Sequence, residues 1–131
     1  MSGDVEYLDL ADLVELTILL MGEPPPIRDV GLLGAAAARP QTTAFGEDAY
    51  PDIWSKAAAL LQSILKNHAL IDGNKRLGWL ATAVFLELNG VTVVEVDNDV
   101  VYDLVLGVAA GSFELDDIAS QLRTAAGQGP R

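Results

Sequence analysis

The spacing of apolar and polar residues predicts helices along almost the whole chain. Over residues 10–21 apolar side chains recur every three or four positions, after a possible N-cap at Asp9. Three consecutive prolines at positions 24–26 would end this helix. The face expected to be buried consists of Leu10, Leu13, Leu16, Thr17 and Leu20.

The same pattern continues to the C-terminus. Further helices are expected at residues 30–38, 52–67, 74–88, 98–110 and 114–126. The helix at 74–88 is apolar over most of its circumference, so it is expected at the centre of the bundle. Residues 91–96, VTVVEV, could form a short edge strand, and residues 127–131 a frayed tail.

Residues 39–51 form the longest polar interruption and predict an irregular or hairpin-like flap with a turn at Gly46. The expected fold class is therefore all-α. A single domain over residues 1–131 would contain a compact bundle of about six helices, with a short flap before the helix pair 52–67 and 74–88.

Composition narrows the function classes. The chain has 131 residues, half of them apolar, and no cysteine, which excludes disulfides, thiolate metal sites and cysteine nucleophiles. Its single histidine excludes a histidine-rich zinc site. The acidic N-terminus does not resemble a signal peptide, and no apolar run approaches the ~20 residues of a membrane span. A cytoplasmic protein without a membrane segment is expected.

The charge distribution points to a small anionic ligand. A net charge of −11 argues against a nucleic-acid surface. Four of the eight cations nevertheless lie between positions 56 and 76, where Asp72 is the sole acid; they are Lys56, Lys66, Lys75 and Arg76. For Lys56 and Lys66 taken alone, the simpler interpretation is a solvated helix face.

The segment NHALIDGNKRLGW, residues 67–79, concentrates the candidate chemistry. If one helix ends near His68 and the next begins near Gly73 or Asn74, unpaired N–H groups at the new helix start face the imidazole. A helix N-terminus with a glycine is an anion site, and two cations in its first turn, Lys75 and Arg76, oppose the helix dipole until an anion binds. These residues therefore predict a phosphate site.

Two side chains of this segment have competing interpretations. Asp72 could simply cap the second helix, or it could hold Mg²⁺ together with phosphate oxygens. His68 could be a structural residue or a general base at neutral pH. A Walker loop is excluded because Ile71 and Asp72 precede Gly73. The chain has no Gly-x-Ser-x-Gly motif to carry a serine nucleophile, which argues against a Ser-His-Asp catalytic triad that uses His68.

At these residues the chain resembles the Fic/Doc family, and in particular its Doc (death-on-curing) branch. The Fic signature His-x-Phe-x-(Asp/Glu)-Gly-Asn-Gly-Arg-x-x-Arg corresponds here to HALIDGNKRLGW, residues 68–79. Lysine at position 75 and the absence of the last arginine, where Trp79 stands, are features of the Doc branch. The likeness extends over roughly residues 8–125, including the segment IRDVGLLGAAAARPQTTAFGEDAYPD.

The resemblance implies a small all-α Fic-fold toxin paired with a Phd-like antitoxin. Doc-type proteins resemble protein kinases that transfer the γ-phosphate of ATP to a threonine of elongation factor Tu, which stops translation. Fic enzymes instead transfer AMP to a protein hydroxyl, with the nucleotide turned around. No Ser/Thr-x-x-x-Glu-Gly/Asn inhibitory helix is evident in the chain, which favours regulation by a separate antitoxin.

Carried over by position, the resemblance gives each motif residue a role. His68 would deprotonate the target hydroxyl and Asp72 would bind Mg²⁺. Gly73 and Asn74 would form the anion hole, and Lys75 and Arg76 would hold the phosphates of ATP. The flap that aligns the target segment would be Thr42, Thr43, Ala44 and Phe45.

Some positions depart from the family pattern. Leu70 replaces the motif phenylalanine as an apolar anchor, and Gly73 agrees with Fic rather than with the alanine of the best-known Doc protein. Thr17 and Gly34 stand where histidine and glutamate are common in the Doc branch. Two alternatives to a kinase therefore stay open: a nucleotidyl transferase that uses the same residues, and a non-catalytic binding module.

Overall fold

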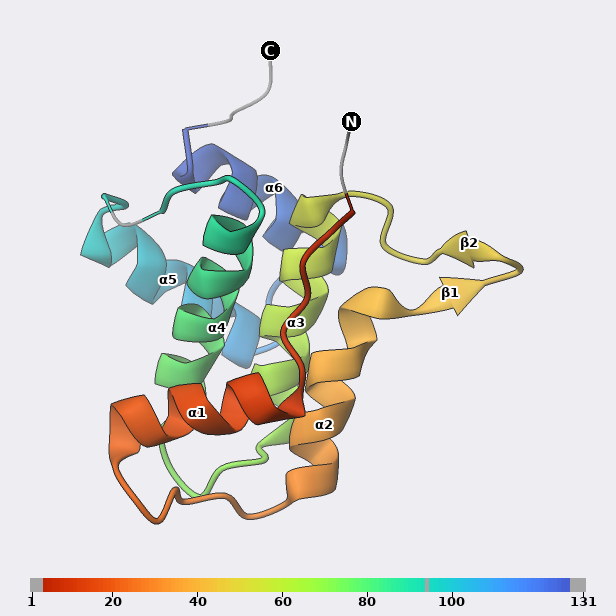
Figure 1. Ribbon diagram of the computed structural model, residues 1–131. Helices are drawn as coiled ribbons and strands as arrows, with labels where there is room; N and C mark the ends of the chain where they lie inside the picture. The colour runs from red at the N-terminus through yellow and green to blue at the C-terminus, as the bar shows by residue number, and fades with distance from the viewer. Residues whose placement is uncertain (1–3, 94, 128–131) are drawn as a thin grey trace.

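The computed structural model describes residues 4–93 and 95–127 and shows a bundle of six α-helices with one small hairpin (Figure 1). The elements are α1 (Leu10–Met21), α2 (Val30–Ala38), the 3₁₀ turn η1 (Arg39–Gln41), β1 (Thr43–Ala44), β2 (Glu47–Asp48), α3 (Ile53–Asn67), α4 (Asn74–Leu88), α5 (Asn98–Ala109) and α6 (Leu115–Ala125). The all-α fold class and the number of helices predicted from the pattern are confirmed.

Acidic N-caps set most of the helix starts. The Asp9 and Asp52 carboxylates each accept a hydrogen bond from the backbone N–H of the third residue of their helix. In return, the side chain of that third residue accepts a hydrogen bond from the backbone N–H of the cap residue. Asp29 caps α2 by accepting from Leu32, the third residue of that helix, and Asp97 caps α5 by accepting from Asp99, the second residue; neither has the reciprocal bond. Such caps stabilise a helix start by ~1 kcal/mol each, and they explain why boundaries could be predicted closely.

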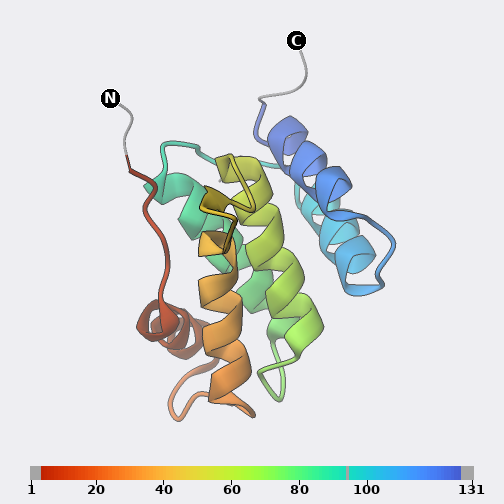
Figure 2. The same cartoon turned by 90° about the vertical axis from the view of Figure 1, so that its right-hand side faces the viewer.

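Helix α3 occupies the centre of the bundle. It packs against α2, α4, α5 and α6, and Figure 2 shows α1 on one side of it and α5 and α6 on the other. Most of its length is buried, from Ser55 to Leu65. The prediction that α4 is central is therefore only partly right: α4 is internal, against α1, α3 and α5, but α3 has more helical neighbours.

One continuous hydrophobic cluster joins all six helices. Thr17 lies fully buried in it, and its hydroxyl donates to the carbonyl of Leu13 at 2.7 Å, so a polar residue is accommodated without a partner from another helix. Gly34 faces Leu10 at the contact of α2 with α1. Among the described residues no helix combines the length and apolarity needed to cross a membrane.

The edge strand predicted at 91–96 is wrong for the residues described there. Residues 91–93 and 95–96 form a connection from α4 to α5, in which the Val91 N–H donates to Leu86 and the Val96 N–H donates to Val93. Among the described residues the paired strands are β1 and β2 alone, so nothing described there pairs with this segment, and Val93 is buried in the core instead. Residue 94 and residues 128–131 of the predicted tail lie outside the described part of the chain.

The flap is a two-stranded antiparallel hairpin, which decides between the irregular and the hairpin-like form that the sequence left open. Thr43 pairs with Asp48 and Ala44 with Glu47, and the turn between them has Phe45 at φ 55° and Gly46 at φ 81°. Figure 1 shows the hairpin projecting from the bundle beyond η1. The Phe45 side chain is fully exposed.

Lys56 does not lie on a solvated helix face, which corrects the simpler interpretation of this residue. It is only 1 % exposed, and its Nζ donates to Asp48 Oδ2 at 3.1 Å and to the carbonyl oxygen of Tyr50. Sequence spacing along α3 could not reveal this, because both partners belong to the flap. Lys66 is exposed, as the solvated interpretation predicted.

Candidate functional site

The candidate site is the loop of residues 68–73 between α3 and α4. Helix α3 ends at Asn67 and α4 begins at Asn74, so the motif lies at the paired ends of two antiparallel helices, as predicted. His68 is the C-cap of α3 with φ 51° and ψ 48°, a left-handed conformation that usually favours glycine or asparagine. This conformation turns the chain sharply at the imidazole-bearing residue.

The loop is fixed from outside by the segment that precedes α2. The N–H groups of Arg28 and Asp29 both donate to the Ala69 carbonyl, at 2.7 and 3.0 Å. The Arg28 guanidinium donates to the His68 carbonyl. Arg28 is therefore a positioning residue that sequence reasoning missed, since nothing in helical periodicity links position 28 to position 68.

The buried anchor of the loop is Leu70, which is 2 % exposed and forms a β-bridge with Ile27. This confirms that leucine at the motif phenylalanine position serves packing. Asn74 then closes the loop from the other side: its amide donates to the Leu70 carbonyl at 2.9 Å and accepts from the Leu70 N–H at 3.1 Å. The Asn74 side chain is thus engaged in loop closure, and the group it can offer an anion is its backbone N–H.

Helix α4 begins without a side-chain cap. Its N-cap is Gly73, at φ 91°, so the prediction that Asp72 sits at the N-cap is wrong by one residue. A Cβ at position 73 would lie 2.9 Å from Met21 Sδ, and the positive φ adds backbone strain for any larger residue. With glycine at the cap, no side-chain oxygen accepts from the first N–H groups of α4, which leaves them available to an anion.

The motif side chains line one small cavity of about 260 Å³. Its walls come from the end of α3, the loop, the first turn of α4 and the end of α5. The lining residues are Leu65, His68, Ile71, Asp72, Gly73, Asn74, Lys75, Arg76 and Ala109. The structure therefore brings together all six predicted motif residues. We call this cavity the motif pocket.

The polar groups of the motif pocket are available to a ligand. The His68, Asp72, Lys75 and Arg76 side chains are exposed. Within the described residues, no hydrogen bond or salt bridge engages the His68 ring, the Asp72 carboxylate or the Lys75 and Arg76 head groups. Two cations beside uncapped N–H groups repel one another and oppose the dipole of α4, and a bound phosphate would offset both effects.

Asp72 is the one carboxylate in the motif pocket. Among the described residues no group of three or more histidine, aspartate or glutamate side chains could hold a metal ion alone. Mg²⁺ commonly uses one or two protein carboxylates and completes its shell with substrate phosphates and water. An exposed, unengaged Asp72 beside a phosphate site fits that arrangement.

The predicted flap residues do not line the motif pocket. The hairpin is attached to α3 through Lys56, which precedes His68 by a helix length of about 18 Å. Thr42, Thr43, Ala44 and Phe45 are all exposed, and Figure 1 shows the hairpin away from the end of α3 that carries His68. A protein segment that touched both would have to span about the length of α3.

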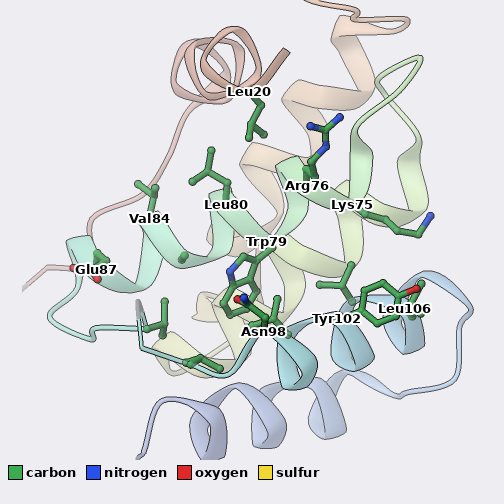
Figure 3. A pocket seen from close by; sticks show the side chains of 15 residues that line it. Leu20, Lys75, Arg76, Trp79, Leu80, Val84, Glu87, Asn98, Tyr102 and Leu106 are labelled. Atoms are coloured by element: carbon green, nitrogen blue, oxygen red, sulfur yellow. The ribbon is translucent and has the colours of Figure 1, made fainter. Parts of the chain in front are cut away.

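A second cavity, of about 880 Å³, adjoins the motif pocket and shares Lys75 and Arg76 with it. It lies between α4 and α5, with Leu20 of α1 at its upper edge in Figure 3. Trp79 and Tyr102 line it, and sequence reasoning did not connect these two residues. Their proximity depends on how α5 docks on α4, which a single sequence does not display.

Comparison with known proteins agrees with the geometry. The signature of the Fic/DOC family matches residues 7–86, well over half of the chain. The chain is also 50 % identical over 118 residues to a protein named Toxin Doc from Mycolicibacterium smegmatis, which covers 89 % of this chain and 91 % of that protein. The expected resemblance is thereby confirmed: this chain belongs to the Fic/Doc family.

Proposed function

We propose that this protein is the toxin of a toxin–antitoxin pair and acts as an ATP-dependent protein Ser/Thr kinase. By resemblance its target is a translation factor, elongation factor Tu, and its antitoxin is Phd-like. The observation that supports the proposal is the motif pocket, where an imidazole, a carboxylate, an uncapped helix start and two cations surround one cavity.

In this proposal each group has a chemical task. His68 accepts the proton of the target hydroxyl as the hydroxyl oxygen attacks the γ-phosphorus. The bond between the γ-phosphorus and the β–γ bridging oxygen breaks, and ADP leaves. The N–H groups at the start of α4, together with Lys75 and Arg76, stabilise the charge on the transferred phosphoryl group.

ATP is the proposed co-substrate and Mg²⁺ the proposed metal. Asp72 would hold the metal together with phosphate oxygens, and Mg²⁺ when bound neutralises part of the phosphate charge. The flap residues Thr42 to Phe45 are proposed to align the target segment through the exposed edge of β1, as an added strand does. Arg28 keeps the His68 backbone in place through the carbonyl contact.

The second candidate is nucleotidyl transfer, in which the hydroxyl attacks the α-phosphorus and pyrophosphate leaves. Gly73 favours it, because the Fic signature has glycine at this position. Trp79 disfavours it, because the Fic signature has arginine there. Both reactions use the same motif pocket, so the position of the label in ATP distinguishes them.

We expect purified protein, incubated with elongation factor Tu and Mg²⁺, to transfer label from γ-labelled ATP and not from α-labelled ATP. Mass spectrometry of the target should show the gain of one phosphate on a threonine or serine. His68→Ala should slow transfer by about 10²- to 10⁴-fold, the usual contribution of a general base. Label arriving only from α-labelled ATP would replace the kinase by the nucleotidyl transferase.

The control variant is Lys66→Ala, which removes an exposed cation of α3 that does not line the motif pocket. It should transfer phosphate at the rate of the unaltered protein. Expression of the unaltered protein or of Lys66→Ala should arrest cell growth. Expression of His68→Ala or Asp72→Ala should leave growth unaffected. Growth arrest that persisted in both variants would favour the non-catalytic binding module.

A further inference from the structure

Arg39, the residue at which α2 passes into η1, holds both ends of the flap. Its backbone carbonyl accepts from the Thr42 N–H at 3.0 Å and from the Thr42 hydroxyl at 2.7 Å, which fixes the chain where it enters the hairpin. Its Nε donates to the Tyr50 hydroxyl at 2.9 Å, where the chain leaves the hairpin. The guanidinium also lies over the Tyr50 ring, 5.3 Å from the ring centroid. One residue therefore connects the entrance and the exit of the flap.

The Arg39 guanidinium is also attached to α3. Its Nη1 donates to Gln62 Oε1 at 2.8 Å, to the Ser63 hydroxyl at 3.0 Å and to the Ala59 carbonyl at 3.3 Å. Ser63 lies five positions before His68, which is about 7.5 Å along the helix. The Arg39 side chain thus joins the flap to the part of α3 that leads to the imidazole.

These contacts are made without a carboxylate partner for Arg39. Among the described residues no carboxylate forms an ion pair with it, and each of its side-chain acceptors is a neutral oxygen. Hydrogen bonds to neutral oxygens depend on direction, and the planar guanidinium holds its N–H groups in fixed directions, which a lysine ammonium does not. The contacts therefore specify the geometry of the junction between the flap and α3.

We infer that Arg39 is a positioning residue that sets which hydroxyl of the target segment faces His68. The inference rests on the proposed function, in which the target pairs with β1 as an added strand and presents its hydroxyl to the imidazole. Backbone hydrogen bonds fix the register of such a strand, so the distance from β1 to His68 decides which target residue reaches the imidazole. Arg39 holds that distance because its contacts reach the flap and α3 at once.

A loosened junction between the flap and α3 should cause one particular error. A strand advances about 3.3 Å per residue, and its side chains alternate between the two faces. A slip of one residue turns the acceptor hydroxyl away from the imidazole, whereas a slip of two residues, about 6.6 Å, brings another side chain of the same face opposite it. Phosphate should then appear two residues before or after the usual acceptor.

The test uses a peptide of the segment that the unaltered protein labels in elongation factor Tu. The peptide carries threonine at the acceptor position and at the positions two residues to either side, and tandem mass spectrometry locates the phosphate. We expect the unaltered protein to modify the central threonine and Arg39→Ala to modify the flanking threonines as well. The KM for the peptide should rise about tenfold in Arg39→Ala, as the loss of oriented hydrogen bonds implies, while the KM for ATP stays constant.

Two further variants separate geometry from charge. Tyr50→Phe removes the hydroxyl that accepts from Arg39 Nε and keeps the ring against the guanidinium, so it should misplace phosphate in the same way but to a smaller extent. Arg39→Lys keeps the positive charge and loses the planar guanidinium, so it should misplace phosphate as Arg39→Ala does. Because Tyr50→Phe changes one exterior hydroxyl group, it keeps the inference testable if Arg39→Ala fails to fold.

The control for a general loss of stability is Leu104→Val, which removes apolar volume at a buried residue of α5 that does not line the motif pocket. It should lower the thermal midpoint and still modify the central threonine alone. Phosphate misplaced by Leu104→Val as much as by Arg39→Ala would overturn the inference, since any destabilised variant would then lose the register. Modification of the central threonine alone by both Arg39→Ala and Tyr50→Phe would overturn it as well.

Failure of the proposed function has a different signature. Label that arrives from α-labelled ATP alone would overturn the kinase, and its distribution over the three threonines would test Arg39 in the same way. A protein that transfers no label would overturn the proposed function, and hydrogen exchange would then decide the role of Arg39. Residues 42–50 should exchange faster in Arg39→Ala than in the unaltered protein, and equal exchange would overturn the inference.

Discussion

At the scale of single residues, the backbone of His68 is held in a conformation that its side chain does not favour. A left-handed φ of 51° costs a β-carbon-bearing residue ~1–2 kcal/mol relative to glycine. The Arg28 contact to the His68 carbonyl and the two N–H donors on Ala69 hold the loop in this state. Strain that is retained at a candidate catalytic residue is typical of functional sites.

We therefore expect His68→Gly to be more stable than His68→Ala by about 1 kcal/mol, although both lose the imidazole. Urea unfolding followed by circular dichroism measures the difference. Both variants should be inactive in the label-transfer assay. A His68→Ala variant as stable as His68→Gly would mean that the left-handed conformation carries no cost at this position.

Residue-level chemistry could be predicted from the sequence where it depends on near neighbours in the chain. The sequence placed His68, Asp72, Gly73 and the two cations around one anion site because all of them lie within nine consecutive positions. It could not place Arg28, whose contact with His68 spans forty positions. It also assigned the helix cap to Asp72, because aspartate is a common cap and the positive φ of Gly73 was not visible.

At the scale of elements, the flap is fastened to the bundle by a buried lysine. The Lys56 side chain is 2 % exposed and that of its partner Asp48 is 54 % exposed, so the pair lies at the edge of the core. A second contact reinforces it, in which Arg39 Nε donates to the Tyr50 hydroxyl at 2.9 Å. Lys56 and Arg39 thus connect the base of the hairpin to α3 and η1.

We expect Asp48→Asn to loosen the hairpin, because it leaves the buried ammonium of Lys56 without its anionic partner. The cost should be about 1 kcal/mol of unfolding free energy, since Asp48 itself is half in solvent. Hydrogen exchange measured by mass spectrometry should be faster over residues 42–50 and unchanged in α4. If the flap aligns the target, the KM for the protein substrate should rise while that for ATP stays constant.

The matched control is Glu47→Gln, which removes a neighbouring exposed carboxylate of β2. Hydrogen exchange in the hairpin should be unaffected by it. Equal effects from both variants would show that general charge on the flap, and not the contact with Lys56, holds it.

Helices and the hairpin could be predicted from the sequence where the residues that determine them are near neighbours in the chain. Helix starts followed from Asp9, Asp29 and Asp52, whose caps act within three residues. The flap followed from an extended run with a glycine turn. The strand proposed at 91–96 failed because β-branched residues fit a buried connection as well as a strand, and only a partner strand would have decided between them.

At the scale of the whole molecule, one core and a strongly acidic composition act against each other. The hydrophobic cluster extends through all six helices, so the protein is expected to unfold as one unit. The chain carries 19 acidic residues and 8 lysine and arginine residues, and this excess of negative charge repels itself in the compact state. The cations of the motif pocket are local exceptions in an otherwise repulsive field.

Screening of this repulsion should stabilise the fold. We expect the thermal midpoint to rise by a few degrees as NaCl increases from about 0.01 to 0.2 M, with most of the rise at the low end, where the Debye length changes most. Circular dichroism at neutral pH measures it. The double variant Glu15→Gln with Asp103→Asn, which removes two exposed carboxylates from α1 and α5, should start at a higher midpoint and gain less from salt. A midpoint that falls with added salt would instead mean that attractive pairs, such as that of Lys56 with Asp48, outweigh the net repulsion.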